Sequence, residues 1–166
     1  MILGILKEMV YKFIRFKNLV PIRGGNNVYQ KILLAAEGSK HSLKAADKAI
    51  ALAKMNEGAK VEVVYVVDSK TSKSDALRQL DAYGVAEKRE ERLRATVEKA
   101  KNAGVNYEIK LLRGEPAPTI IKYANENDFD LVVIGSRGLN ALQEMVLGSV
   151  SHKVAKYVQC PVLIVK

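Results

Sequence analysis

The sequence predicts an α/β fold with a doubly wound parallel sheet. Five short apolar runs alternate with longer, charged segments of helical character along the 166-residue chain. Strands separated by helices favour a parallel sheet, because each crossover helix returns the chain to start the next strand in the same direction. The composition, 48% hydrophobic and 27% charged, is that of a globular protein, and the length suits one domain with a sizeable core.

The five expected strands are short and apolar. The second is dense in valine, and the fourth is an unbroken apolar run that predicts a strand buried on both faces. In the third, Tyr107, Ile109 and Leu111 alternate with Glu108 and Lys110, which is typical of an edge strand. The strands are expected at Lys31–Ala36, Val61–Val67, Tyr107–Leu112, Asp130–Ile134 and Val162–Val165.

The expected helices fall between these strands. Ser42 is the candidate N-cap of the first helix, and Pro116 suits the first turn of the third. The second helix is long and charged, with a candidate break near Tyr83–Gly84 and a stop at Gly104. The helices are expected over Ser42–Asn56, from Ser74 to Ala103, from Pro116 to about Asn127, and from Ser149 to Val158.

The segment from Ile134 to Ser149 carries the clearest functional signal. Gly135 and Gly138 follow the fourth strand, and Gly148 with Ser149 opens the last helix. Glycines let backbone N–H groups approach an anion, and a helix N-terminus adds free N–H groups and the positive end of the helix dipole. We therefore expect a polyphosphate site. Gly138 and Gly148 are expected to be required there, because any side chain would occupy the volume of a phosphate oxygen or forbid the required φ angle. The plainer alternative is that they only shape a turn and cap a helix.

The spacing Gly-x2-Gly-x9-Gly-Ser in this segment resembles the nucleotide-binding signature of the universal stress protein family, in its ATP-binding branch. Three further stretches resemble the same family: Ile32–Ser39 with the turn after it, Gly114–Ala117, and Cys160–Val165. The resemblance covers roughly Tyr29 to Lys166. It implies a Rossmann-like three-layer sandwich, similar to the adenine-nucleotide alpha hydrolases, with a five-stranded parallel sheet in the order 3-2-1-4-5. It also implies a homodimer that pairs through the last strand, Val162–Val165.

The resemblance further implies an ATP site at the carboxyl ends of the first and fourth strands, where the strand order reverses. Ala35 and Val66 match positions that contact the adenine, Val66 through its backbone. Glu37 stands where the family usually has an aspartate that meets the adenosine. Arg137 could add a charge-assisted contact to a phosphate oxygen. The other implied ATP-binding positions, mostly the phosphate cradle, are Ile134, Gly135, Gly138, Gly148, Ser149, Val150 and Ser151.

Glu37 is the main departure from the family pattern. Its side chain is one methylene longer than that of aspartate, so the carboxylate would be displaced by roughly a bond length unless the backbone shifts. An exposed turn carboxylate is the alternative for Glu37, and a solvent-facing loop residue is the alternative for Arg137.

Other kinds of chemistry are disfavoured. The sequence has neither a P-loop motif nor Gly-x-Gly-x2-Gly after the first strand. His41 and His152 are isolated and expected at the surface or at helix ends, and Cys160, the single cysteine, is expected in the core. No structural metal and no catalytic residue are expected. Mg²⁺ or Mn²⁺ could accompany ATP through its phosphates and a carboxylate such as Glu37 or Asp68. Fast phosphoryl transfer is not expected, because no clear base is available to position a water.

Residues 1–28 form a separate region ahead of the domain at 29–166. The stretch Met1–Val20 predicts an amphipathic helix, and Val20–Asn27 is a turn-rich linker. The region has five basic side chains and one acidic side chain, a net charge of +4. We expect the helix to pack on protein; contact of residues 1–20 with an anionic membrane surface is a less favoured alternative, and disorder is a third. The apolar face consists of Ile2, Ile5, Leu6, Met9, Phe13 and Phe16.

The net charge of +9 raises nucleic acid as a partner. The lysines are scattered along helices without an aromatic ladder, so no specific nucleic-acid partner is expected. No window of about 18 apolar residues predicts a membrane span, and a single cysteine suits a reducing cytoplasm, where we expect the protein.

These features together predict an ATP-binding protein that acts as a nucleotide-dependent switch in stress response, with little or no hydrolysis. A slow ATPase is one alternative. A nucleotide-free structural or interaction module of the same fold is another, in which the basic amino-terminal helix would contact a partner or a membrane surface.

Overall fold

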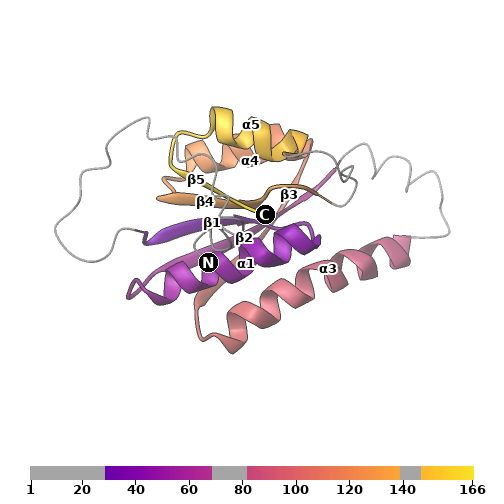
Figure 1. Ribbon diagram of the computed structural model, residues 1–166. Coiled ribbons are helices and arrows are strands. Elements are labelled where there is room, and N and C mark those ends of the chain that lie inside the picture. The colour runs from indigo at the N-terminus through magenta and orange to yellow at the C-terminus, as the bar shows by residue number, and fades with distance from the viewer. Residues whose placement is uncertain (1–28, 69–81, 139–146) are drawn as a thin grey trace, which may run out of the picture.

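The computed structural model describes residues 29–68, 82–138 and 147–166 of the chain, and a parallel sheet of five strands lies at its centre (Figure 1). The order across the sheet is β3-β2-β1-β4-β5, so β1 pairs with both β2 and β4. The predicted fold class is confirmed. The strands are β1 Lys31–Ala35, β2 Lys60–Val67, β3 Asn106–Arg113, β4 Leu131–Gly135 and β5 Val162–Val165.

Helices cover both faces of the sheet. Helices α1 (Lys40–Lys54) and α3 (Ala82–Asn102) lie on one face, and α4 (Pro116–Glu126) and α5 (Ser149–Tyr157) lie on the other (Figure 1). Alternate side chains of β1 therefore enter two separate cores: Ile32 and Leu34 pack under α1 and α3, whereas Leu33 packs under α4 and α5. This double burial explains why the central strands appear as unbroken apolar runs in the sequence.

The third strand lies at an edge of the sheet, as its alternating pattern predicts. Tyr107 packs against the core under α1 and α3. Ile109 and Leu111, on the same face, remain 41% and 64% exposed. The apolar half of the alternation is therefore covered only in part, because an edge strand has a neighbouring strand on one side alone.

The predicted start of the first helix is wrong by two residues. Helix α1 begins at Lys40, and Ser39, not Ser42, is its N-cap, because the Ser39 hydroxyl accepts the Ser42 N–H at 3.1 Å. The Ser42 hydroxyl is buried and accepts the N–H of Glu37 at 3.1 Å. The two serines together hold the turn after β1 in place.

The other helix predictions agree with the structure where it describes them. Helix α3 begins at Ala82, next to the candidate break, and Tyr83 and Gly84 belong to its first turn. Residues 74–81, predicted as the start of this helix, lie outside the described chain. Gly104 follows α3 with a φ of +67°, and Pro116 opens α4.

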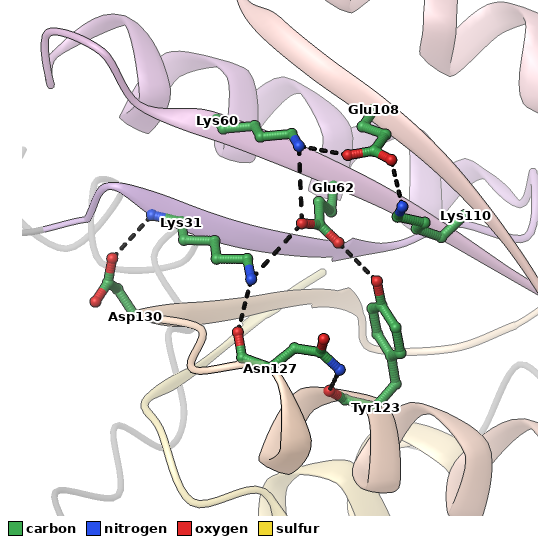
Figure 2. A network of polar contacts seen from close by, with 8 residues as sticks. All are labelled: Lys31, Lys60, Glu62, Glu108, Lys110, Tyr123, Asn127 and Asp130. Carbon is green, nitrogen blue, oxygen red and sulfur yellow. Dashed lines mark hydrogen bonds and ion pairs between the residues drawn. The ribbon is translucent and has the colours of Figure 1, made fainter.

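Polar side chains tie the sheet together at the amino ends of its strands (Figure 2). Glu62 of β2 is only 5% exposed, and its carboxylate accepts the Tyr123 hydroxyl of α4 at 2.8 Å. The ammonium groups of Lys31 and Lys60 lie 3.8 and 4.0 Å from the same carboxylate. Asp130 accepts the backbone N–H of Lys31 at 2.8 Å. The polar groups at the amino ends of the strands are thus bound to one another. In such a sheet a ligand binds at the opposite, carboxyl ends of the strands.

Further predictions concern the amino-terminal segment, membrane-spanning helices and Cys160. The helix predicted over Met1–Val20 lies outside the described residues. Within residues 29–68, 82–138 and 147–166, no helix has both the length and the apolar character needed to cross a membrane. Cys160 packs, partly buried, against the core under α4 and α5, and burial raises the pKa of its thiol to about 11.

Candidate functional site

A cavity of about 410 Å³ opens at the carboxyl ends of β1, β2 and β4. The strand order reverses between β1 and β4, and ligands of doubly wound folds bind at this point. Every position predicted for ATP binding lines this cavity. These residues are Ala35, Glu37, Val66, Ile134, Gly135, Arg137, Gly138, Gly148, Ser149, Val150 and Ser151.

Four lining residues were not predicted from the sequence: Ala36, Val64, Pro116 and Ile120. Val64 precedes Val66 by two positions on β2 and therefore lies on the same face of the sheet. Pro116 and Ile120 lie one helical turn apart on α4. Strand alternation places Val64 on the same face as Val66, but no local pattern distinguishes a residue that lines the cavity from one in the core. The four residues complete an apolar wall on the α4 side of the cavity.

The opposite side of the cavity consists of the loop after β4 and the start of α5. Gly148 is the N-cap of α5 and offers no side chain to cap the helix. The N–H groups of Ser149, Val150 and Ser151 belong to the first helical turn, where no intrahelical acceptor is available. Such N–H groups, together with the positive end of the helix dipole, suit an anion.

Ser136 connects the loop to the helix. Its carbonyl oxygen accepts the N–H of Gly148 at 2.7 Å and the hydroxyl of Ser151 at 2.8 Å. The N–H of Ser136 itself donates to Val165 of β5 at 2.7 Å. The position of the helix N-terminus relative to the sheet is therefore fixed by the backbone of one loop residue.

The three glycines of the motif differ in what they require. None has a positive φ; among the described glycines, the left-handed conformation occurs at 38, 58, 104 and 114. The special φ angle expected at Gly138 and Gly148 is therefore wrong, and space is the remaining reason. A Cβ at Gly135 would lie 2.8 Å from the His41 carbonyl carbon, and one at Gly148 would lie 3.3 Å from the Ser136 oxygen.

Glu37 and Arg137 contribute the charged groups of the lining. Glu37 accepts the hydroxyl of Ser39, and its carboxyl carbon lies 4.0 Å from where a Cβ of Gly138 would be. The Glu37 side chain thus points across the cavity toward the glycine loop. Arg137 places a guanidinium nitrogen 3.4 Å from Nε2 of His41. Both residues belong to the site and are not solitary surface charges.

The acidic groups near the cavity are few. Glu37 is the one carboxylate among its described lining residues, and Asp68, the other candidate partner of a metal, does not line it. In the parts of the chain that the structure describes, no cluster of three or more His, Cys, Asp or Glu side chains could hold a metal ion. Any ion bound here would depend mainly on oxygen atoms supplied by a ligand.

Fold and crevice together define a class of protein. It is a doubly wound α/β domain in which a glycine-rich loop and a helix N-terminus border the cavity at the topological switch point. The model of the universal stress protein family matches residues 28–166, and the chain belongs to that family.

Known relatives agree over most of the chain. Universal stress protein MJ0531 of Methanocaldococcus jannaschii is 36% identical over 148 residues, which cover 87% of this chain and 86% of that protein. Universal stress protein YxiE of Bacillus subtilis is 38% identical over 149 residues, which cover 84% of this chain and all of the relative. The resemblance noted in the sequence is therefore confirmed at the level of the family.

Solved structures agree in fold. Hypothetical protein MJ0577 superposes with a TM-score of 0.72 at 26% identity, over 84% of this chain and 96% of its own. A universal stress protein in complex with cAMP superposes with a TM-score of 0.61 at 28% identity, over 84% of this chain and 98% of its own.

Proposed function

We propose that this protein binds ATP in the cavity and acts as a nucleotide-dependent switch, with little or no hydrolysis. The observation that carries the proposal is the convergence of eleven sequence-predicted positions on a cavity of about 410 Å³. They come from β1, β2 and β4, from the loops after β1 and β4, and from the N-terminus of α5. A volume of this size is typical of small-molecule sites. The relative in complex with cAMP supports an adenine nucleotide as ligand of this fold.

The apolar wall suits the adenine ring. Val64 and Val66 of β2, Ile120 of α4 and Ile134 of β4 line the cavity and pack in the same apolar cluster. An aromatic base gains free energy from leaving water for such a wall. Glu37 follows β1 in the same lining and would accept a hydrogen bond from the adenosine part of the nucleotide.

The other end suits the phosphates. The first turn of α5 offers backbone N–H groups from Ser149, Val150 and Ser151, and Arg137 adds a positive charge. Mg²⁺ or Mn²⁺ would accompany the phosphates, which supply most of its oxygen ligands. In the switch that we propose, occupancy of this site is the signal that a partner recognises.

Slow turnover follows from the lack of a water-positioning base. Glu37 is the only carboxylate of the described lining, and it already accepts the Ser39 hydroxyl. Phosphoryl transfer needs a group that orients the attacking nucleophile in line with the leaving group. We therefore infer a nucleotide sensor and not an efficient enzyme. We place it in the cytoplasm because a single cysteine suits a reducing compartment.

Calorimetric titration of ATP into the wild type and a Gly148→Val variant tests the proposal. Wild type should bind ATP, and the variant should not, because the new side chain would crowd the Ser136 oxygen and the phosphate position. A phosphate-release assay accompanies the titration. Release that vanishes in Gly148→Val would indicate a slow ATPase, and absence of binding to wild type would indicate a nucleotide-free module.

A further inference from the structure

A row of lysines runs along the exposed side of α1. The four positions fall within about a third of the helix circumference and span roughly 21 Å of its length. Their side chains are exposed, whereas the opposite side of the helix, with Ala45, Ala49 and Ala53, is buried against the sheet. The lysine row consists of Lys40, Lys44, Lys48 and Lys54.

The lysine row has no acidic partner in the part of the chain that the structure describes. Asp47 is the one acidic residue of α1, and its carboxylate binds Lys99 of α3 at 2.6 Å. Glu57, in the turn after α1, forms no ion pair with the row. By contrast, Lys60 on β2 is paired with Glu108 on β3. The row is therefore a strip of uncompensated positive charge on the side of the molecule that α1 and α3 cover (Figure 1).

The lysine row does not help α1 to form. Like charges four residues apart, such as Lys40 with Lys44 and Lys44 with Lys48, destabilise a helix. A cation in the first turn also opposes the helix dipole, and α1 has no acidic residue there to offset Lys40. Local choices that work against stability are expected where a surface has a function. The row therefore indicates a binding partner outside the chain.

A polyanion with its charges in a line fits the lysine row best. Basic residues along one helix face are typical of proteins that contact the phosphate backbone of nucleic acids. An anionic membrane fits less well, because membrane-surface helices insert an apolar face beside the basic one, and the apolar side of α1, with Ile50, is buried in its own core. Among the exposed large apolar residues of the described chain, Met55 alone adjoins α1, and one residue is not a face.

We propose that the lysine row of α1 binds the phosphate backbone of nucleic acid, without preference for base sequence. Each lysine that neutralises a phosphate releases a counterion, so the logarithm of the affinity falls with the logarithm of the salt concentration by about 0.9 per contact. Full use of the row corresponds to a slope of roughly −3 to −4. None of the four lysines lines the cavity, so the inference is independent of the proposed ATP site.

Fluorescence anisotropy of the full-length protein with a mixed-sequence DNA duplex, between about 50 and 200 mM salt, tests the proposal. Lys44→Gln and Lys48→Gln should each weaken binding and make the slope shallower by about 1. Lys122→Gln is the matched control, because it removes the same charge from an exposed position on α4, on the other face of the sheet. Its affinity and slope should follow wild type. Urea midpoints of the variants at or above that of wild type would show that weaker binding does not reflect unfolding.

The comparison separates the row from the other basic region of the chain. Residues 1–28 have a net charge of +4, and their contribution is the same in wild type and in each variant. Failure of wild type to bind the duplex overturns the proposal. An equal loss in Lys44→Gln and Lys122→Gln also overturns it, since affinity would then follow net charge alone. Sedimentation with anionic vesicles that requires Lys44, without binding to the duplex, would overturn it in favour of a membrane surface.

Discussion

At the scale of single residues, the three glycines of one motif serve different ends. Gly135 is buried, and a Cβ there would meet backbone atoms of α1 at 2.8 and 2.9 Å, so it is required for the packing of the helix on β4. At Gly138 the nearest contact of a Cβ with the described part of the chain would be the Glu37 carboxyl carbon, at 4.0 Å. A single sequence pattern therefore combines a fold requirement with positions that a ligand would use.

Gly135→Ala should lower the free energy of unfolding. Backbone atoms of His41 and Ser42 would have to move to admit the methyl group, and overpacking of this kind costs about 1–3 kcal/mol. Urea denaturation followed by circular dichroism measures the change. Gly138→Ala is the matched control and should stay within about 0.5 kcal/mol of wild type; equal stability of the two variants would contradict the packing argument.

Glu37→Ala should lower the affinity for ATP and for AMP by about tenfold, because a hydrogen bond to a charged group is worth roughly 1.5–3 kcal/mol. Inorganic triphosphate should bind the variant as it binds wild type. Glu37→Asp, which restores the residue usual in the family, should keep binding of both nucleotides. Calorimetry gives all the affinities. An ATP affinity that is unchanged in Glu37→Ala would mean that the carboxylate does not reach the adenosine.

At the scale of the elements, α4 is tied to the sheet through one buried carboxylate. Tyr123 on α4 donates to Glu62 on β2 at 2.8 Å, and Lys31 on β1 donates to the Asn127 carbonyl at the end of α4 at 2.7 Å (Figure 2). Burial and the neighbouring carboxylate raise the pKa of Tyr123 to about 12, so the phenol remains a donor throughout the neutral range. Since Ile120 lies on the same helix, this contact also fixes the apolar wall of the cavity.

Tyr123→Phe should destabilise the fold by about 1–3 kcal/mol, because the buried Glu62 carboxylate would lose a hydrogen-bond donor. Tyr157→Phe is the control, since Tyr157 is 55% exposed at the end of α5 and its change should be nearly neutral. Urea midpoints of the two variants settle the comparison. A Tyr123→Phe midpoint equal to that of wild type would show that the lysines alone satisfy Glu62.

The elements also show which parts of the fold can be predicted from sequence. Strands β1 and β4 are central and buried on both faces, so their unbroken apolar runs predict them well. The start of α1 was misplaced because Ser39 and Ser42 both suit an N-cap. In the structure Gly38, with a φ of +87°, directly precedes Ser39, which is the N-cap.

The site was predictable where its chemistry has a sequence signature. Glycines and hydroxyl residues at fixed spacing mark the phosphate side, and all of them line the cavity. Val64 and Ile120 on the other wall are ordinary apolar residues. Whether such residues face a core or a cavity depends on the placement of α4, which no local pattern encodes. The pairing of Arg137 with His41 likewise joins residues 96 positions apart.

At the scale of the whole molecule, two edges of the sheet are open among the described residues, at β3 and at β5. We propose that β5, Val162–Val165, pairs with its counterpart in a second copy to form a homodimer. An edge strand offers unpaired N–H and C=O groups for such an interface. The amphipathic helix predicted for residues 1–20 would then cover apolar surface on the dimer.

Deletion of residues 1–27 should leave ATP affinity unchanged and lower either solubility or oligomer size, because the apolar face of this segment would no longer cover protein. Light scattering of both proteins measures the size. Salt-sensitive sedimentation of the full-length protein alone with anionic vesicles would instead support the membrane-surface alternative. If neither assay separates the two proteins, both interpretations of the segment fail.

The most direct measurement of the central claim is the nucleotide that the protein retains. Purified protein is incubated with ATP, freed of unbound nucleotide by gel filtration and denatured, and the supernatant is separated by anion exchange. The proposed switch predicts intact ATP in stoichiometric amount from wild type and none from Gly148→Val. A wild-type supernatant without adenine nucleotide, or with equal nucleotide from the variant, would contradict the assignment of the cavity as an ATP site.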